Sequence, residues 1–145
     1  MDFLEIDALV SGIIYSSEAA KQDLGRRFAA YLGLTPGKSG SDGGIDGYAK
    51  LNHDMIYFQS KLSQNILDAS YTADLIGNMM IHEANIGIML AGAGYTDGFR
   101  SRLNKAIQSK QINTQLKIHL LSLEDVFGET DIFIKATQDL PKLNL

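Results

Sequence analysis

Three side chains of types that could do chemistry stand close together in one segment, SDGGIDGYAKLNHDMIYFQSK: Asp46, Gln59 and Lys61. A carboxylate with neutral oxygens is a hard ligand set that suits magnesium or manganese and suits zinc poorly. A lysine beside such an ion can hold or help deprotonate an attacking water, or neutralise charge on a phosphate. If the three side chains converge, the chemistry they favour is hydrolysis of a phosphodiester bond.

A β-hairpin would bring these side chains together. The residue pattern predicts strands over 45–50 and 55–62, and the polar tetrapeptide LNHD between them suits a hairpin turn. A turn centred on the middle two residues of LNHD places Asp46 opposite Gln59, with Cβ atoms about 5 Å apart. Lys61 then lies on the same face, because side chains alternate along a strand, at a diagonal of about 7–8 Å from Asp46. The simpler interpretation is a glycine-rich turn with an ordinary cross-strand ion pair, and spacing alone favours it.

The rest of the chain predicts helices alternating with strands. Ser16 or Ser17 could cap a helix that has Glu18 in its first turn and ends near Gly33, and Thr96 could cap another. The continuous apolar run 86–92 is typical of a buried strand. Other expected elements are helices in 1–15, 67–85 and 95–110, a strand and a short helix in 116–128, and a helical tail from Glu129. The order α-α-β-β-α-β-α-β-α indicates a mixed sheet flanked by helices, an α/β fold.

The composition indicates one ordinary globular domain. The 145 residues are 45% hydrophobic and 21% charged, with no apolar run that approaches a membrane span. The acidic start MDFLEIDALVSG lacks the basic region of a signal peptide. The absence of cysteine excludes a disulfide scaffold, a thiolate zinc site and a cysteine nucleophile, and it fits a cytoplasmic protein. A net charge of -4 argues mildly against a nucleic-acid coat, although the total can hide a local basic patch.

The segments SDGGIDGYAK and IYFQSK together resemble the catalytic core of the PD-(D/E)xK nuclease superfamily, in particular the Mrr-like restriction endonucleases. Those enzymes typically carry a glycine-rich D-G-G-I-D strand followed by a strand that ends in Q-x-K. The segments DLIGNMM, ANIGIMLAGAGYTDGFRSRL and IHLLSLEDVF are similar to the family's later core elements. The resemblance covers roughly residues 18–127 and implies a restriction-endonuclease-like core, with the N-terminal helix and the C-terminal tail as additions.

The resemblance assigns roles to individual residues. Asp46 matches the metal-binding aspartate, Lys61 the catalytic lysine, and Gln59 a position that is Glu in much of the superfamily and Gln in the Mrr-like branch. The family usually adds a glutamate from the first core helix. Glu18 is the only glutamate on that helix and is preferred, whereas Asp23 lies nearer to where the pattern would place an acid. Asp42, in the glycine-rich turn, is expected to be structural.

The resemblance implies an endonuclease that uses Mg2+ or Mn2+ to hydrolyse DNA, with Asp46, Glu18 and Gln59 at the metal and Lys61 assisting the water. A homodimer or higher homo-oligomer is expected because cutting two strands together needs two active sites, and a partner subunit is a further option. The apolar N-terminal segment is the candidate interface. Two alternatives stay open: a catalytically silent domain of the same fold that serves DNA binding or assembly, and a Holliday-junction resolvase.

Three weaker patterns carry no assignment. GAGYTDG fails the dinucleotide fingerprint because Asp97 stands where the third glycine belongs. His82 and Glu83 form no zinc motif because position 86 is isoleucine, and no histidine is assigned to catalysis. The basic residues of the helix after Thr96 suit either a solvated face or contacts with phosphates.

Overall fold

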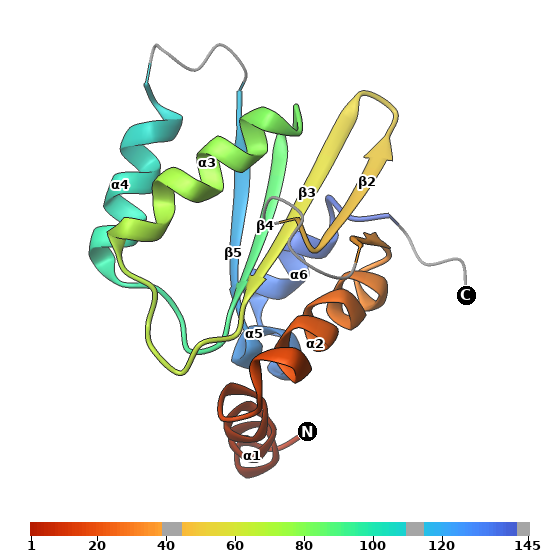
Figure 1. The fold of residues 1–145 in the computed structure, drawn as a ribbon, viewed down its shortest axis with the longest axis vertical. Helices are drawn as coiled ribbons and strands as arrows, with labels where there is room; N and C mark the ends of the chain where they lie inside the picture. The colour runs from red at the N-terminus through yellow and green to blue at the C-terminus, as the bar shows by residue number, and fades with distance from the viewer. Residues whose placement is uncertain (39–44, 110–114, 142–145) are drawn as a thin grey trace.

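The computed structural model of the protein describes residues 1–38, 45–109 and 115–141. A five-stranded mixed sheet lies at its centre, in the order β1-β2-β3-β4-β5 (Figure 1). Strand β2 is antiparallel to both β1 and β3, whereas β3, β4 and β5 run parallel to one another. The strands are β1 Thr35–Pro36, β2 Gly47–Leu51, β3 Asp54–Lys61, β4 Ile86–Ala91 and β5 Lys117–Ser122. This arrangement confirms the predicted mixed sheet with flanking helices.

Side-chain caps start most of the helices. Ser17 accepts a hydrogen bond from the N–H of Ala20 at the start of α2, and Thr96 accepts one from Phe99 at the start of α4, as the sequence predicts. Gly33 follows α2 with a φ of 82°, a conformation that glycine adopts without strain. The helices are α1 Phe3–Ile14, α2 Glu18–Tyr31, the 3-10 turn η1 Ala69–Tyr71, α3 Thr72–Ile81, α4 Asp97–Ile107, α5 Leu123–Gly128 and α6 Asp131–Thr137.

Helices cover both faces of the sheet. Ile56 and Phe58 of β3 pack into the apolar cluster under α2, α5 and α6, whereas Tyr57 packs into a second cluster under α3 and α4. Figure 1 shows α3 and α4 on one side of the sheet and α2, α5 and α6 on the other. Side chains alternate between the two faces along β3. This alternation therefore decides which layer of helices each side chain near the end of β3 can reach.

The structure differs from the prediction in two elements. The helix expected over 67–85 is shorter, because Asp68 caps the 3-10 turn η1 and α3 runs only from Thr72 to Ile81. Strand β1 was not predicted, because its two residues include a proline and show no alternating pattern. Asp42 with the glycines on either side of it, and position 110 at the end of the helix expected over 95–110, lie outside the described residues.

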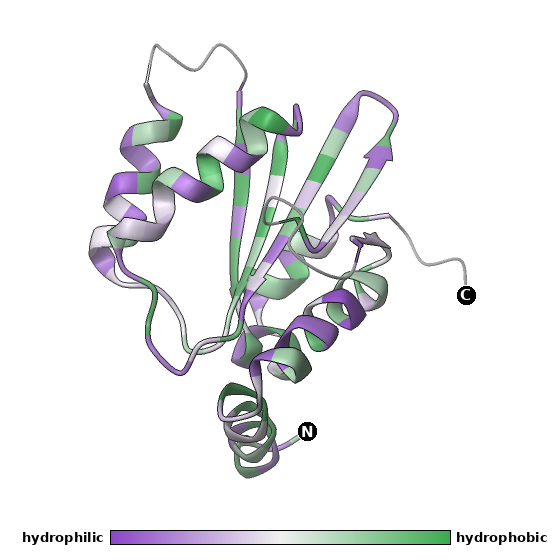
Figure 2. Cartoon of the chain, in the orientation of Figure 1, coloured by the Kyte–Doolittle hydropathy of each residue, from purple (hydrophilic) through white to green (hydrophobic). Residues whose placement is uncertain are grey.

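Helix α1 stands apart from the sheet. None of its residues is buried, and Phe3 and Leu4 are 71% and 77% exposed. One stripe of the helix, including Val10 and Ile13, packs against the body, mainly beside α5. Figure 2 shows the apolar residues of α1 on the projecting end of the molecule. Across the three described ranges, no helix has both the length and the apolar character needed to cross a membrane.

Candidate active site

The predicted hairpin is present with the predicted register. Leu51 pairs with Asp54 and Gly47 with Phe58, so the turn is centred on the two residues between the strands. Asn52 takes a left-handed φ of 54°, which asparagine tolerates in such turns. The pairing ends at Gly47, and Asp46 lies in a bend just before β2.

Ser60 is the partner of the Asp46 carboxylate. Its backbone N–H and its hydroxyl donate to Asp46 Oδ2, at 2.7 and 3.1 Å. The expectation that Asp46 directly faces Gln59 is therefore corrected, because the bend turns the carboxylate towards two donors of the next residue. Gln59 Oε1 instead accepts a hydrogen bond of 3.1 Å from the Tyr57 hydroxyl. Ser60 escaped the sequence analysis because a serine in a strand carries no distinctive pattern.

A glycine in α2 allows the helix to approach this pair. A Cβ at Gly25 would collide with Ser60 Oγ and would stand 3.7 Å from Asp46 Cγ. Gly25 is buried in the middle of α2, where a glycine weakens a helix relative to alanine. The close contact between α2 and the Asp46–Ser60 pair accounts for its presence.

Burial raises the pKa of the Asp46 carboxyl above its ordinary value of 3.8. The two hydrogen bonds from Ser60 and the positive charge of Lys61 oppose this rise but do not cancel it. The protein neighbours of Asp46 thus offset only part of the cost of burying its charged form. A cation beside the carboxylate would supply the missing compensation.

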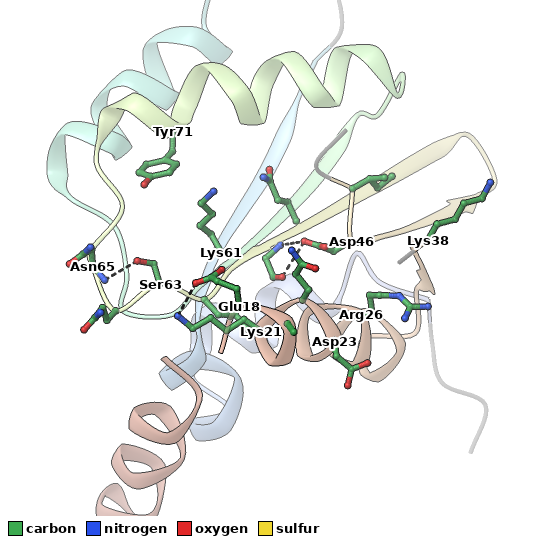
Figure 3. A pocket seen from close by; sticks show the side chains of 17 residues that line it. Glu18, Lys21, Asp23, Arg26, Lys38, Asp46, Lys61, Ser63, Asn65 and Tyr71 are labelled. Atoms are coloured by element: carbon green, nitrogen blue, oxygen red, sulfur yellow. Dashed lines mark hydrogen bonds and ion pairs between the residues drawn. The ribbon is translucent and has the colours of Figure 1, made fainter. Parts of the chain in front are cut away.

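All the predicted site residues line one cleft of about 780 Å³: Glu18, Asp23, Asp46, Gln59 and Lys61. The cleft lies between α2, the end of β3 and the segment that leads into η1 (Figure 3). The sequence analysis missed Gln22, which also lines the cleft one helical turn after Glu18. The helical spacing of the two could have revealed it.

The two candidate acids of α2 have partners of their own. Glu18, whose side chain is 87% exposed, lies 3.7 Å from Lys21, and Asp23 lies 2.8 Å from Arg27. In Figure 3 the Asp23 carboxylate points away from Asp46, whereas Glu18 lies on the side of the cleft near Lys61. Within the part of the chain that the structure describes, neither acid hydrogen-bonds to Asp46. Of the two, Glu18 is better placed to reach a ligand in the cleft.

Positive charge gathers around this cleft. It is lined by four basic side chains, Lys21, Arg26, Lys38 and Lys61, against three carboxylates, whereas the whole chain has a net charge of -4. Arg26 is held in place by donating from Nε to the carbonyl of Gly37, at 2.9 Å. In Figure 3, Arg26 and Lys38 lie on one side of Asp46 and Lys61 on the other. A chain of phosphates laid across Asp46 would meet cations on both sides.

The donor set of the cleft fits a hard cation. Among residues 1–38, 45–109 and 115–141 there is no cluster of three or more histidine, aspartate or glutamate ligands. A magnesium ion here would rest on Asp46, on neutral oxygens such as that of Gln59, and on water or phosphate, with Glu18 at the edge. Magnesium commonly binds in this way, through one or two carboxylates and substrate oxygens.

Comparison of the chain with protein-family models, curated proteins and solved structures gave no significant match.

Proposed function

We propose that this protein is a metal-dependent endonuclease with a restriction-endonuclease-like core of the PD-(D/E)xK, Mrr-like type, and that it hydrolyses DNA phosphodiester bonds. The observation that carries the proposal is the joint position of Asp46 and Lys61 in one cleft with excess positive charge. Burial raises the pKa of the Asp46 carboxyl, so a bound cation would stabilise its charged form. Lys61 is close enough to Asp46 for its positive charge to lower that pKa. The resemblance of the SDGGIDGYAK and IYFQSK segments to the nuclease pattern supports the same function.

In this mechanism each side chain of the cleft has a separate role. Asp46, oriented by Ser60, would hold magnesium or manganese together with Gln59 and Glu18. An ion held there would supply Lewis acidity to a phosphate and make water a stronger nucleophile. The Lys61 ammonium would orient the attacking water and offset charge on the phosphate. Arg26 and Lys38 would hold the DNA backbone on the far side of Asp46.

A homodimer or higher homo-oligomer is part of the proposal, because the described residues of one chain form one such cleft and cutting both strands together needs two. The exposed apolar side of α1 is the surface proposed for this contact with a second copy. A cytoplasmic location is part of the proposal and fits the cysteine-free composition.

The experiment is a cleavage assay on plasmid, linear and branched DNA with magnesium or manganese, comparing the parent, Lys61→Ala and Lys50→Ala. Lys50 is an exposed lysine of β2 that does not line the cleft, so it is the matched control. We expect Lys61→Ala to lose roughly 100-fold or more in rate, as removal of a transition-state electrostatic contact does, while Lys50→Ala cleaves like the parent. Equal rates for the parent and Lys61→Ala would refute the proposal, and cleavage confined to branched DNA would favour a resolvase.

The ion pairs of the α2 acids favour one second candidate, a catalytically silent module of the same fold that binds DNA or serves assembly. With Glu18 engaged by Lys21 and Asp23 by Arg27, Asp46 would stand without a second carboxylate. This candidate predicts DNA binding that is unchanged by magnesium, with no cleavage of any of the three substrates. A gel-shift titration with and without magnesium, run beside the cleavage assay, separates the two functions.

A further inference from the structure

The aromatic ring of Tyr71 lies opposite α2 across the cleft and next to the ammonium of Lys61 (Figure 3). Lys61 Nζ stands 5.3 Å from the centre of the ring, within the range of a cation–π contact. We infer that Tyr71 is a positioning residue: its ring holds the Lys61 ammonium at one place in the cleft that Asp46 also lines. The functional part of this inference rests on the proposed nuclease activity, whereas the contact itself does not.

Lys61 needs such a partner because of its place in the fold. It is the last residue of β3 and is exposed, so its four-carbon stem is free to take many rotamers. Across the described ranges the Lys61 ammonium has no ion pair within 4.0 Å, and the Tyr71 ring is the contact found for it. Lys61 is also close enough to Asp46 for its charge to lower the pKa of that carboxyl. The ring therefore limits the positions from which the ammonium can act.

Hydrogen bonds hold the backbone around Tyr71, so the position from which the ring projects is fixed. Asp68 caps η1 by accepting from the N–H of Ser70 at 2.9 Å, and the buried Thr72 hydroxyl donates to the Ala69 carbonyl at 2.8 Å. Before the turn, the N–H of Leu67 donates to the Gly94 carbonyl at 3.0 Å, and the Leu67 carbonyl accepts from Thr96 at 2.9 Å. These bonds tie η1 to the segment that leads into α4. A ring on a rigid support orients a flexible lysine rather than moving with it.

The aromatic face, and not the hydroxyl, carries the effect. Tyr71→Phe keeps the ring and should preserve the position of Lys61. Tyr71→Leu fills much of the same space without a quadrupole, so it removes the attraction while it limits the packing loss. Tyr48→Leu is the control, because Tyr48 is a half-exposed tyrosine of β2 that does not line the cleft.

The contact is tested by NMR, with no need for activity. We expect ring-current shifts of the Lys61 ε-methylene protons in the parent, in Tyr71→Phe and in Tyr48→Leu, and the loss of these shifts in Tyr71→Leu. The thermal midpoint of each variant shows whether it is folded. Unchanged Lys61 shifts in a folded Tyr71→Leu variant would overturn the inference.

The positioning role is tested by steady-state cleavage at saturating magnesium. We expect Tyr71→Leu to lower kcat by roughly two- to fivefold, the size of an exposed cation–π contact, with KM little changed. Tyr71→Phe and Tyr48→Leu should retain the kcat of the parent. A similar loss of kcat in Tyr71→Phe, or a change in KM alone, would refute the role. A parent without any activity would refute the proposed nuclease and the positioning role, and the NMR result would still decide on the contact.

Discussion

Asp46 and Ser60 are joined by two hydrogen bonds that end on the same oxygen, Asp46 Oδ2. Among the described neighbours, the other oxygen of the carboxylate accepts no hydrogen bond. Ser60 thus fixes the orientation of the Asp46 carboxylate, which lines the cleft. In the proposed mechanism Ser60 would orient Asp46 as a metal ligand, as hydrogen bonds commonly do for carboxylates that bind metals.

Replacing Asp46 by asparagine should separate activity from stability. The amide oxygen can still accept the bonds of Ser60, but it cannot hold magnesium as a carboxylate does, so we expect cleavage to fall by roughly two orders of magnitude or more. The raised pKa means that the contribution of Asp46 to stability is present below the ordinary value of 3.8 and is lost as the pH rises through the raised pKa. At neutral pH and without metal, Asp46→Asn should therefore be at least as stable as the parent.

Urea unfolding at neutral and acidic pH measures this difference. A variant that is less stable than the parent by more than about 1 kcal/mol at neutral pH would contradict it, because such a loss is the size of a hydrogen bond.

Gly25→Ala should loosen the site although alanine favours helices. The added Cβ collides with Ser60 Oγ and lies 3.4 Å from Ser60 Cβ, so either Ser60 leaves Asp46 or α2 moves outwards. We expect a net destabilisation of about 1–3 kcal/mol, typical of overpacking, together with slower cleavage. The matched control is Gly77→Ala in α3, where an added Cβ meets nothing within 4 Å.

Chemical denaturation of both variants gives the comparison. Gly77→Ala should be stabilised by up to about 1 kcal/mol through helix propensity alone. If Gly25→Ala gained the same amount, the close approach of α2 to Ser60 would not constrain the site.

Asp139 should stabilise the packing of the segment after α6 against β5. Its Oδ2 lies 2.6 Å from His119 Nε2 and 2.8 Å from Lys117 Nζ. Partial burial raises the pKa of the Asp139 carboxyl, but hydrogen bonds from Lys117 and His119 outweigh it, and the net pKa is lowered. The resulting stability is present above the ordinary value of 3.8 and is lost as the pH falls through the lowered pKa.

We expect Asp139→Asn to lower the free energy of unfolding by roughly 1–2 kcal/mol at neutral pH, with a smaller difference from the parent in acid. Thermal melts of the parent and Asp139→Asn from neutral to acidic pH measure this difference in stability. Asp7→Asn, on the exposed surface of α1, is the control. A difference that does not shrink in acid would show that the charge of Asp139 is not responsible.

The apolar side of α1 should hold two copies together. Light scattering on the parent is expected to give at least twice the monomer mass, and Phe3→Ser with Leu4→Ser is expected to give a folded monomer, because burial of such side chains drives association. Ile132→Ser with Ile134→Ser is the control, since both isoleucines are 50% exposed on α6. A parent that scatters as a monomer would contradict the prediction, as would dissociation by the control pair alone.

The main helices and strands could be predicted from the sequence because turn and capping residues mark where they begin and end. The LNHD turn sets the register of β2 and β3, and Ser17 and Thr96 start their helices as capping residues do. Strand β1 was missed because two residues at a sheet edge, one of them a proline, leave no periodic pattern.

The details of the site were harder to predict because they depend on contacts between elements. The arithmetic of the hairpin applies only while residues stay in the strand, and Asp46 leaves it by a bend. The Ser60 contact, the approach of Gly25 and the ring of Tyr71 depend on tertiary packing, which no spacing within one segment encodes. The resemblance directed attention to Asp46, Gln59 and Lys61, and the structure brings all three to one cleft.

The mixed direction of the sheet has a consequence for the order of folding. The β2–β3 hairpin joins neighbours in the chain and can form within microseconds, whereas β3 pairs with β4 at positions about 30 residues away, such as Ile56 with Ile86. Asp46 and Ser60 therefore meet through a short chain loop, before the parallel strands and α2 need be in place. Mutations in this hairpin should slow refolding, whereas mutations in α2 should mainly speed unfolding.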